Sequence, residues 1–485
     1  MQAGRIGLSA LALALALALS GAVTAQEVVT KQYDDGSVYE GTFRNGRQDG
    51  IGTYTLPNGY SYTGAWVDGE IRGKGRAQYP NGSVYEGEFD KGKPVGAGKI
   101  TFPDGGTYVG QWTAGAMTGQ GVARYANGSA YTGAFVEGKH SGRGVMTEPG
   151  GTTYDGDWVA GVKEGRGRIA YADGTVFDGT LRGGRREGKG KLTMPDGLTY
   201  DGMWTGGQIN GPGKLTQPNG DVYEGSFTDG QRDGTGRVTY GNGDVYDGAF
   251  TADKRQGKGA FTARDGTRYA GDWVSGRMEG QGVMTYADAA IYEGAFKADQ
   301  PDGIGKITYQ DRSTYHGLWR AGVITGKGRA VYASGLVYEG EFVGARPEGV
   351  GMMTYPDGYI YQGQWKDGQR EGEGRAAYKD GTVYAGHFSA GVRDGKGTLT
   401  APDGFTYVGD WKAGVIDGQG TATYPGGDIY EGTFVAGKRE GQGRLTYKAG
   451  ETSEGVWRNG ILTAPTPVAP AAPAEGAAPA EGGGG

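Results

Sequence analysis

The sequence contains no cysteine, and only three of its 485 residues are histidine. The absence of cysteine excludes disulfide bonds, thiolate-bound zinc, iron–sulfur clusters, cysteine nucleophiles and a lipid-modified N-terminal cysteine. The histidines, His140, His316 and His387, are widely separated, and no recurrent serine or carboxylate accompanies them, so we expect all three to be solvated. Few side chains of the types that bind metals or carry out acid–base catalysis therefore remain.

Basic residues are not in excess. The chain has 49 Lys and Arg residues against 55 Asp and Glu residues, which gives a formal net charge of −6. Nucleic-acid-binding proteins use a concentrated positive charge to contact phosphates. We therefore predict that no nucleic acid is a partner.

Long apolar runs are confined to the first 25 residues. Arg5 precedes a Leu/Ala run from Leu8 to Leu19, and the small-residue pattern Val23-Thr24-Ala25 follows it. This order is typical of a secretory signal peptide cut after Ala25, and a run of about twelve residues is short of the roughly 20 that span a bilayer. We predict an exported protein, periplasmic or released outside the cell; a retained membrane anchor is the alternative.

Glycine and tyrosine are abundant instead. Gly accounts for 103 residues and Tyr for 32, whereas Pro accounts for 18. The glycine content is about three times ordinary usage, yet 11% of the residues are aromatic, and these supply apolar area that a disordered chain or a collagen lacks. The composition favours a repetitive, turn-rich β protein.

From Tyr39 onward the chain repeats every 23 residues without a gap, and we number the positions of each repeat 1 to 23. Position 1 is Tyr in 17 of 19 repeats, position 3 is Gly in all of them, and positions 12 and 14 are Gly in all 18 full repeats. A fixed period of this length indicates a repeat architecture. Position 5 is Phe or Trp except at Leu181, and it holds all nine tryptophans: Trp66, Trp112, Trp158, Trp204, Trp273, Trp319, Trp365, Trp411 and Trp457.

Each repeat has the pattern of a β-hairpin. In residues 83–89, the rings of Tyr85 and Phe89 alternate with small or polar residues, as in a strand with one apolar face. A second strand is predicted over residues 96–102, after a loop from Asp90 to Val95. Turns such as residues 57–59, Pro-Asn-Gly, join successive hairpins, because an Asn-Gly pair suits positive φ. No helical apolar period occurs after residue 25.

The glycines at positions 3, 12 and 14 share the predicted face of the rings. A missing side chain opens a slot in which a ring can lie across the backbone. Burial of roughly 150–250 Å² per ring offsets the cost of about 0.5–1 kcal/mol for each strand glycine. We therefore predict that the nine tryptophans and the tyrosines form a structural core; an aromatic cage for a ligand is the alternative.

These 23-residue repeats resemble the MORN repeat, a module of the same length. The resemblance rests on motifs such as Tyr361-Gln362-Gly363-Gln364-Trp365, followed by Asp367-Gly368 and Gly372-Glu373-Gly374, and it covers residues 33 to about 462. It implies an all-β fold: an elongated single-layer array of antiparallel β-hairpins. It also implies roles in scaffolding, self-association and partner binding, with phospholipid headgroups often proposed as ligands. Some family members add a kinase or methyltransferase domain, for which this chain has no room.

The predicted organisation has four parts. Residues 1–25 form the signal peptide, residues 26–38 a lead-in, residues 39–462 an array of 18 to 19 repeats, and residues 463–485 an Ala/Pro/Gly-rich disordered tail. Position 5 alternates Phe and Trp, so the working unit is about 46 residues, and this alternation slips once near residues 223–250. The slip marks a fused array, with a bend or self-association site, or a neutral duplication.

Irregular repeats follow the slip. Asp253 and Asp299 replace the glycine of position 8, and Ala289 and Arg312 replace the turn glycine. We expect altered hairpin geometry in these repeats, because glycine adopts positive φ more readily than residues with a side chain.

The variable residues at positions 9 and 10 are the candidate interaction loops. They are basic in Phe-type repeats, at Arg47, Lys93, Lys139, Arg185, Arg186, Arg232, Lys254, Arg255, Arg346, Arg393, Lys438 and Arg439. They are mostly apolar in Trp-type repeats, at Ile71, Met117, Ile209, Met278, Ile324 and Ile416. One edge would then carry alternating cationic and apolar side chains that suit a partner or an anionic surface. The alternative is that these residues fold back onto neighbouring hairpins and offset nearby acids.

We interpret the chain as a non-enzyme without a cofactor or metal. Its Gly-x-Gly strings and its position-2 carboxylates recur in every part of the array, whereas a nucleotide site or a glycosidase pair is unique to one place. The leading function is a structural and interaction scaffold that self-associates, as a dimer, and binds a protein partner. The alternatives are binding to anionic phospholipid headgroups and binding to cell-wall glycans.

Overall fold

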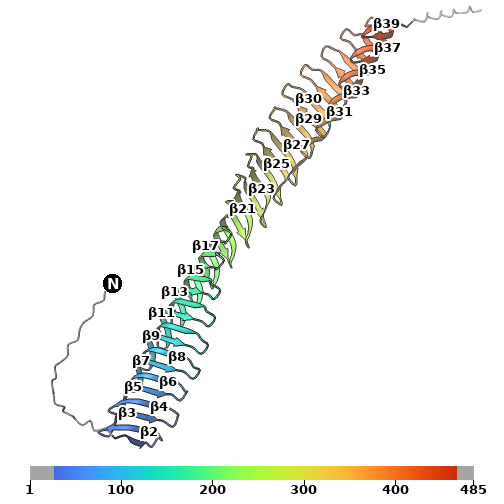
Figure 1. Cartoon of the computed structure of the whole chain (residues 1–485). Helices are drawn as coiled ribbons and strands as arrows, with labels where there is room; N and C mark the ends of the chain where they lie inside the picture. Colours follow the sequence, from blue (N-terminus) through green and yellow to red (C-terminus); the bar gives the residue numbers. More distant parts are fainter. Residues whose placement is uncertain (1–26, 467–485) are drawn as a thin grey trace, which may run out of the picture. The chain divides into compact units, whose positions relative to one another are not determined.

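The computed structural model describes residues 27–466, and the predicted signal peptide and most of the predicted tail lie outside this range. The described residues fall into two units, divided between Pro218 and Asn219, which we describe separately. Both units are built of β-strands (Figure 1), and the described residues contain no helix that could cross a lipid bilayer.

Unit 1 contains seventeen strands. They are β1 (Val29–Gln32), β2 (Val38–Arg44), β3 (Arg47–Thr55), β4 (Ser61–Val67), β5 (Glu70–Gln78), β6 (Val84–Asp90), β7 (Lys93–Thr101), β8 (Thr107–Thr113), β9 (Ala116–Arg124), β10 (Ala130–Val136), β11 (Lys139–Thr147), β12 (Thr153–Val159), β13 (Val162–Ala170), β14 (Val176–Arg182), β15 (Arg185–Thr193), β16 (Thr199–Thr205) and β17 (Gln208–Thr216).

Unit 2 contains the remaining twenty-two strands, β18 to β39. They are β18 (Val222–Thr228), β19 (Gln231–Thr239), β20 (Val245–Thr251), β21 (Lys254–Thr262), β22 (Arg268–Val274), β23 (Arg277–Thr285), β24 (Ile291–Lys297), β25 (Gln300–Thr308), β26 (Thr314–Arg320), β27 (Val323–Val331), β28 (Val337–Val343), β29 (Arg346–Thr354), β30 (Ile360–Lys366), β31 (Gln369–Ala377), β32 (Val383–Ser389), β33 (Val392–Thr400), β34 (Thr406–Lys412), β35 (Val415–Thr423), β36 (Ile429–Val435), β37 (Lys438–Thr446), β38 (Thr452–Arg458) and β39 (Ile461–Pro465).

Within each unit every strand pairs antiparallel with its neighbours in sequence. The register is the same from repeat to repeat: in the third repeat, Tyr85 of β6 lies opposite Ile100 of β7, and Gly87 lies opposite Gly98. Position 3 then pairs again with position 14 of the preceding repeat, as Gly87 does with Gly75. The prediction of an all-β array of antiparallel hairpins is confirmed.

The hairpin loops are shorter than the sequence predicted. Instead of six residues from Asp90 to Val95, only Lys91 and Gly92 separate β6 from β7. Their φ values of 48° and 77° are those of a tight two-residue hairpin turn, which needs positive φ at both residues. As a consequence, positions 9 and 10 belong to a strand and not to a loop tip.

The glycine of position 12 has a different role from the one predicted. The register shifts between positions 3 and 4, as in the β-bulge at Gly87 and Glu88. Gly96, at position 12, adopts a φ of 62°, and a side chain there would meet the carboxylate of Glu88 on the face opposite the rings. Position 12 therefore serves the bulged backbone conformation and leaves no slot for a ring.

Positions 3 and 14 do provide the predicted slot. Side chains on Gly87 and Gly98 would overlap the ring of Tyr85. The Tyr85 hydroxyl donates a hydrogen bond to the Glu88 carbonyl at 3.2 Å, so the ring is fixed across the glycine pair. The same contact recurs along both units.

Rings of successive repeats pack edge to face. The Tyr85 ring centroid lies 5.0 Å from that of Phe89 in its own strand and 5.0 Å from that of Trp112 in the next repeat. The Trp112 indole N–H also donates to the Gly98 carbonyl at 3.3 Å. This geometry is favourable for aromatic quadrupoles and leaves the buried indole N–H paired.

The rings are buried within a single chain. All nine tryptophans are between 2% and 7% exposed, and most position-1 tyrosines are inaccessible. Side chains at positions 10 and 16, such as Pro94 and Ile100, cover the rings from the same face. A second chain is therefore not needed to cover the aromatic face.

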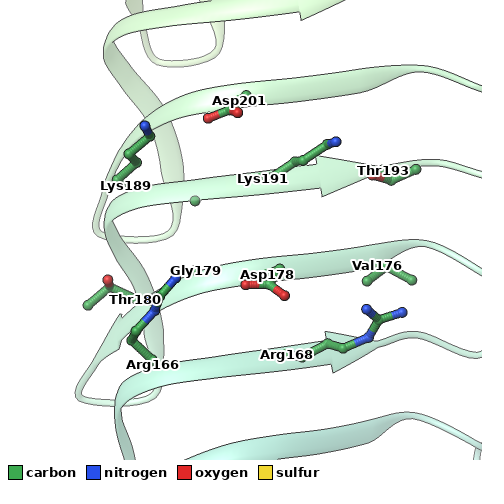
Figure 2. Close-up of a pocket in the computed structure, with 11 residues that line it drawn as sticks. Arg166, Arg168, Val176, Asp178, Gly179, Thr180, Lys189, Lys191, Thr193 and Asp201 are labelled. Carbon is green, nitrogen blue, oxygen red and sulfur yellow. The ribbon is translucent and has the colours of Figure 1, made fainter.

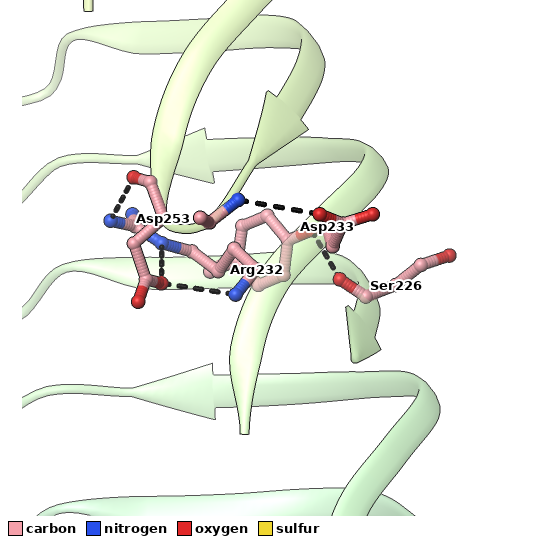
Figure 3. Close-up of polar contacts among 6 residues, drawn as sticks. Ser226, Arg232, Asp233 and Asp253 are labelled. Carbon is pink, nitrogen blue, oxygen red and sulfur yellow. Dashed lines mark hydrogen bonds and ion pairs between the residues drawn. The ribbon is translucent and has the colours of Figure 1, made fainter. Parts of the chain in front are cut away.

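The irregular repeats keep the regular geometry, so the expectation of altered hairpins is wrong. Asp253, Asp299, Ala289 and Arg312 adopt φ values of 66° to 71°, in the same left-handed region as the glycines they replace. The Asp253 carboxylate accepts a hydrogen bond from the Arg232 backbone N–H at 3.0 Å (Figure 3), and this bond helps to offset the backbone strain.

Candidate interaction surfaces

The face opposite the rings is exposed throughout both units. It is made of the side chains at positions 2, 4, 13 and 15, and we call it the open face. In β34, for example, Val408 at position 2 is 54% exposed, whereas Tyr407 beside it is fully buried. Ile51, Ile304 and Val350, all at position 13, are also 59% to 65% exposed. The open face thus presents polar and apolar side chains to solvent.

Shallow grooves run between two walls of side chains on the open face. The glycine pairs of positions 3 and 14 form the floor, position 13 forms one wall, joined in unit 1 by Thr180 at position 4, and positions 2 and 15 form the other wall. Unit 2 holds two such grooves. One of about 790 Å³ is lined by Ile304, Val283 and His316, and another of about 580 Å³ is lined by Glu373, Lys396 and Glu431, among others.

The groove in unit 1 is the most basic of the three. It has a volume of about 700 Å³ and lies over strands β13 to β16 (Figure 2). Its charged lining consists of four cations and two anions, namely Arg166, Arg168, Lys189, Lys191, Asp178 and Asp201. Each groove thus has its own charge and polarity, although the backbone beneath is the same.

The candidate cations at position 9 lie at the loop edge of the sheet. Each is the first residue of a strand and is exposed: Arg47, Lys93, Lys139, Arg185, Lys254, Arg346 and Lys438. Arg346 also lies 3.6 Å from the Asp367 carboxylate of the next repeat. Within each unit these cations recur along the loop edge, interspersed with repeats whose position 9 is uncharged or, at Glu70, acidic.

The candidate residues at position 10 lie over the rings instead. The apolar ones, Ile71, Met117, Ile209, Met278, Ile324 and Ile416, are half-buried or buried and lie opposite tryptophan in the register. The two-residue turn thus places these six residues on the ring face and not at the edge, whereas Val162, Val323 and Val415 at position 9 are 44% to 49% exposed there.

The position-10 arginines cap the aromatic core. The guanidinium of Arg186 lies 4.1 Å from the Trp204 ring centroid and donates to the Gly207 carbonyl at 2.8 Å. A cation placed over an indole face in this way stabilises the fold, more so when it is partly desolvated. The other arginines that stack on rings in this way are Arg232, Arg255, Arg370, Arg393 and Arg439.

Acidic side chains at position 11 accept hydrogen bonds from the turn of the next repeat. This role was not predicted from the sequence. Asp417, for example, accepts a hydrogen bond from the Ala436 backbone N–H in the next turn at 3.1 Å. Equivalent bonds to the next turn are made by Glu164, Glu187, Asp233, Glu279, Asp302, Glu348, Glu371, Asp394 and Glu440. The recurrence of acids at position 11 was the available signal.

The three histidines differ in environment. His140 stacks on Tyr131 with ring centroids 3.8 Å apart and shares a 2.6 Å hydrogen bond with the Tyr125 hydroxyl. Burial lowers the pKa of His140, so the prediction that it is solvated is wrong. A ring nitrogen of His387 lies 2.9 Å from the Asp394 carbonyl, and His316 is exposed on the open face. Residues 27–466 contain no group of acids and histidines suited to a metal ion.

Comparison with known families decides the identity of the repeat. The MORN repeat model matches eighteen segments from 39–59 to 430–452, each beginning at position 1. The chain belongs to the MORN repeat family. Its MORN repeats fill the array with at most two residues between successive matches.

Other similarities to this MORN repeat chain are local or weak. Alsin of Rattus norvegicus is 45% identical over 49 residues, which are 9% of this chain and 3% of Alsin. The chain thus corresponds to a small part of that relative.

Similarities to solved structures are distant, as two examples show. The TCP10 domain of Danio rerio CPAP, bound to a peptide of STIL, is 16% identical with a TM-score of 0.17, covering 55% of this chain and 93% of that one. The SAS-4 TCP domain of Drosophila melanogaster, bound to a proline-rich motif of Ana2, is 16% identical with a TM-score of 0.19, covering 44% and 98%. With scores this low, these likenesses say nothing of function.

Proposed function

We propose that this chain is a non-catalytic MORN scaffold that binds protein partners along its open face. The observation that carries the proposal is the groove system of that face, three grooves of about 580 to 790 Å³ with a constant glycine floor and variable walls. The nine tryptophans and the position-1 tyrosines are occupied by their own packing, so these rings offer no free surface to a partner. Exposed apolar side chains between charged walls are typical of interaction surfaces.

Site-directed crosslinking tests the proposal, and the absence of native cysteine makes labelling specific. Val408→Cys and Ile304→Cys place a photo-crosslinker in two groove walls, and Val392→Cys places it at the loop edge with similar exposure. We expect one protein to be crosslinked from both groove positions and not from Val392→Cys. That protein, once purified, should bind the wild-type chain and bind groove-wall variants more weakly. Crosslinking from the loop edge alone would contradict the proposal.

Self-association is a second candidate, and the terminal strands favour it. Among the described residues, β1 pairs only with β2, and β39 pairs only with β38. Val29 and Ile461 in these strands are 43% and 69% exposed, and an open strand edge can pair with another chain. Light scattering coupled to size exclusion should then show concentration-dependent oligomers that Val29→Pro reduces. A monomer at all concentrations would rule this mode out.

Binding to anionic phospholipid is a further candidate, favoured by the exposed position-9 cations at the loop edge. Vesicles containing phosphatidylglycerol should bind the chain at low salt and release it at high salt, since charges at a surface are screened. Replacement of Lys93, Lys139 and Arg185 by Gln should weaken this binding. The glycan-binding alternative gains no support from the tryptophans, since all nine are buried.

A further inference from the structure

Five of the seven open-face cations at position 13 lie opposite an acid. Position 13 is Lys or Arg in seven repeats, and its register partner is position 4 of the next repeat. Lys258 and Lys396 form ion pairs of 2.6 and 2.5 Å with their partners Asp272 and Asp410. Three more cations lie opposite an acid in the register: Lys74 opposite Glu88, Arg143 opposite Asp157, and Lys327 opposite Glu341.

Arg166 and Lys189 are the two exceptions, and they belong to adjacent repeats. Their register partners are Thr180 and Met203, which carry no charge. Within residues 27–466, neither side chain takes part in an ion pair. Both are exposed and both line the 700 Å³ groove of unit 1 (Figure 2).

The two walls of this groove differ in charge. Among the residues that line the groove, one wall carries Arg166, Thr180 and Lys189 and no acid; next to it, the Asp157 carboxylate of β12 accepts a hydrogen bond from the Arg166 backbone N–H at 3.2 Å. The other alternates between cation and anion, in the order Arg168, Asp178, Lys191 and Asp201. Because adjacent strands are about 4.8 Å apart, Arg166 on β13 and Lys189 on β15 are spaced by about 10 Å along the groove.

We propose that this groove binds an acidic, extended segment of a partner protein. The proposal rests on the proposed function of the open face and names the chemistry of one partner. An extended chain in the polyproline II conformation advances about 3.1 Å per residue with three residues per turn, so carboxylates three residues apart lie on the same side about 9 Å apart, close to the spacing of Arg166 and Lys189. The backbone N–H groups of the segment would face Asp178 and Asp201.

The alternating wall favours a polypeptide over a uniform polyanion. A polyphosphate or an anionic membrane surface would bring negative charge against Asp178 and Asp201 as well as against the cations. A peptide presents carboxylates on one side and N–H donors on the other, and this complements both walls.

The test uses a fluorescein-labelled peptide with glutamate at every third residue, and fluorescence anisotropy with the full chain. Thr180→Glu combined with Met203→Glu supplies the two missing acids and removes no cation. We expect this variant to bind the peptide at least about tenfold more weakly, because the added acids would pair with the cations that otherwise make charge-assisted contacts with the peptide. A peptide with lysine in place of glutamate should not bind the wild-type chain.

Lys258→Thr combined with Lys396→Thr is the matched control, because it removes two open-face cations whose charges are already paired. We expect less than about a twofold change for it. Arg166→Thr combined with Lys189→Thr removes the unpaired cations and should match the Thr180→Glu, Met203→Glu variant. Circular dichroism checks that every variant is folded.

Three results would overturn the proposal. The control could lose as much affinity as the test variant, which would make the effect one of net charge. The peptide could fail to bind while phosphatidylglycerol vesicles bind through Arg166 and Lys189, which would indicate a lipid surface. The peptide could fail to bind although crosslinks from Ile304→Cys and Val408→Cys persist, in which case only the acidic partner is wrong; loss of those crosslinks would instead defeat the proposed function.

Discussion

The two faces of each strand follow different rules. In β34, Tyr407 and Trp411 on the ring face are 0% and 5% exposed, whereas Val408 on the open face is 54% exposed. The ring face repeats the same residues in nearly every repeat, and the open face changes its residues from one repeat to the next. Repetition suits nearest-neighbour stacking, which supplies stability in repeat proteins. Variation suits recognition, so stability and binding are separated on opposite sides of one backbone.

The largest expected effect is unfolding at alkaline pH, when the buried tyrosines of the ring face ionise. Burial raises the pKa of Tyr62, Tyr200, Tyr315 and Tyr384 to about 12, against 10.0 for an exposed tyrosine. The folded chain therefore holds these protons more tightly than the unfolded chain does. The resulting stability is complete below pH 10 and is lost as the pH rises from 10 towards 12.

The measurement is a pH titration followed by circular dichroism and tyrosinate absorbance together. We expect unfolding and ionisation of the position-1 tyrosines to coincide between pH 10 and 12. Ionisation of all tyrosines near pH 10 in a chain that stays folded would contradict ring burial.

Removal of one ring compares the two faces within a single strand. Trp411→Ala should destabilise its repeats by about 3–5 kcal/mol, because it removes a buried indole together with its hydrogen bond to the Gly397 carbonyl. Val408→Ala, three residues away on the open face, should cost less than about 0.5 kcal/mol. Urea denaturation and hydrogen exchange of β33 to β35 measure both. Equal effects of the two substitutions would contradict the separation of the faces.

A methyl group added to a slot glycine should destabilise the fold by crowding the ring that lies across it. Gly397→Ala places Cβ against the Tyr384 ring and should cost about 1–3 kcal/mol through overpacking. Gly426→Ala is the matched control, because its Cβ would meet no atom within 4 Å. Denaturant midpoints of both variants check this, and a neutral Gly397→Ala would show that the slot is not required.

The smallest expected effect is a gain in folding stability from a glycine placed at an irregular turn. Ala289 holds a φ of 66°, and Ala289→Gly should stabilise the chain by about 0.5–1 kcal/mol because glycine adopts that conformation without strain. The same change at Ala172, whose φ is not positive, should be neutral or destabilising. Thermal unfolding measures the difference, and a lower melting temperature for Ala289→Gly would contradict this reading of the turn.

The sequence alone predicted the fold because one pattern recurs with a fixed period. It identified the hairpins, the ring positions and the slots at positions 3 and 14. It did not predict the two-residue turn at Lys91 and Gly92, although the Asn-Gly and Asp-Gly pairs at the same positions of other repeats, such as Asp367-Gly368, were the available signal. The β-bulge that follows the turn shifted the expected strand start.

The candidate site was harder to predict because neighbouring positions serve opposite faces. Lys254 and Arg255 are adjacent and both basic, yet Lys254 is exposed at the edge and Arg255 lies 4.1 Å from the Trp273 ring centroid. Only the register separates these roles. The unpaired state of Arg166 and Lys189 likewise depends on which residue of the next repeat lies opposite, and this too follows from the register.

The most direct test of the central claim is acrylamide quenching of tryptophan fluorescence in the full chain. It should be done at a concentration where light scattering shows a monomer. We predict a blue-shifted emission that acrylamide quenches weakly, because every tryptophan is 2% to 7% exposed in a single chain. Strong quenching in the monomer, relieved only when the chain dimerises, would show that the rings need a second chain, and it would contradict the account.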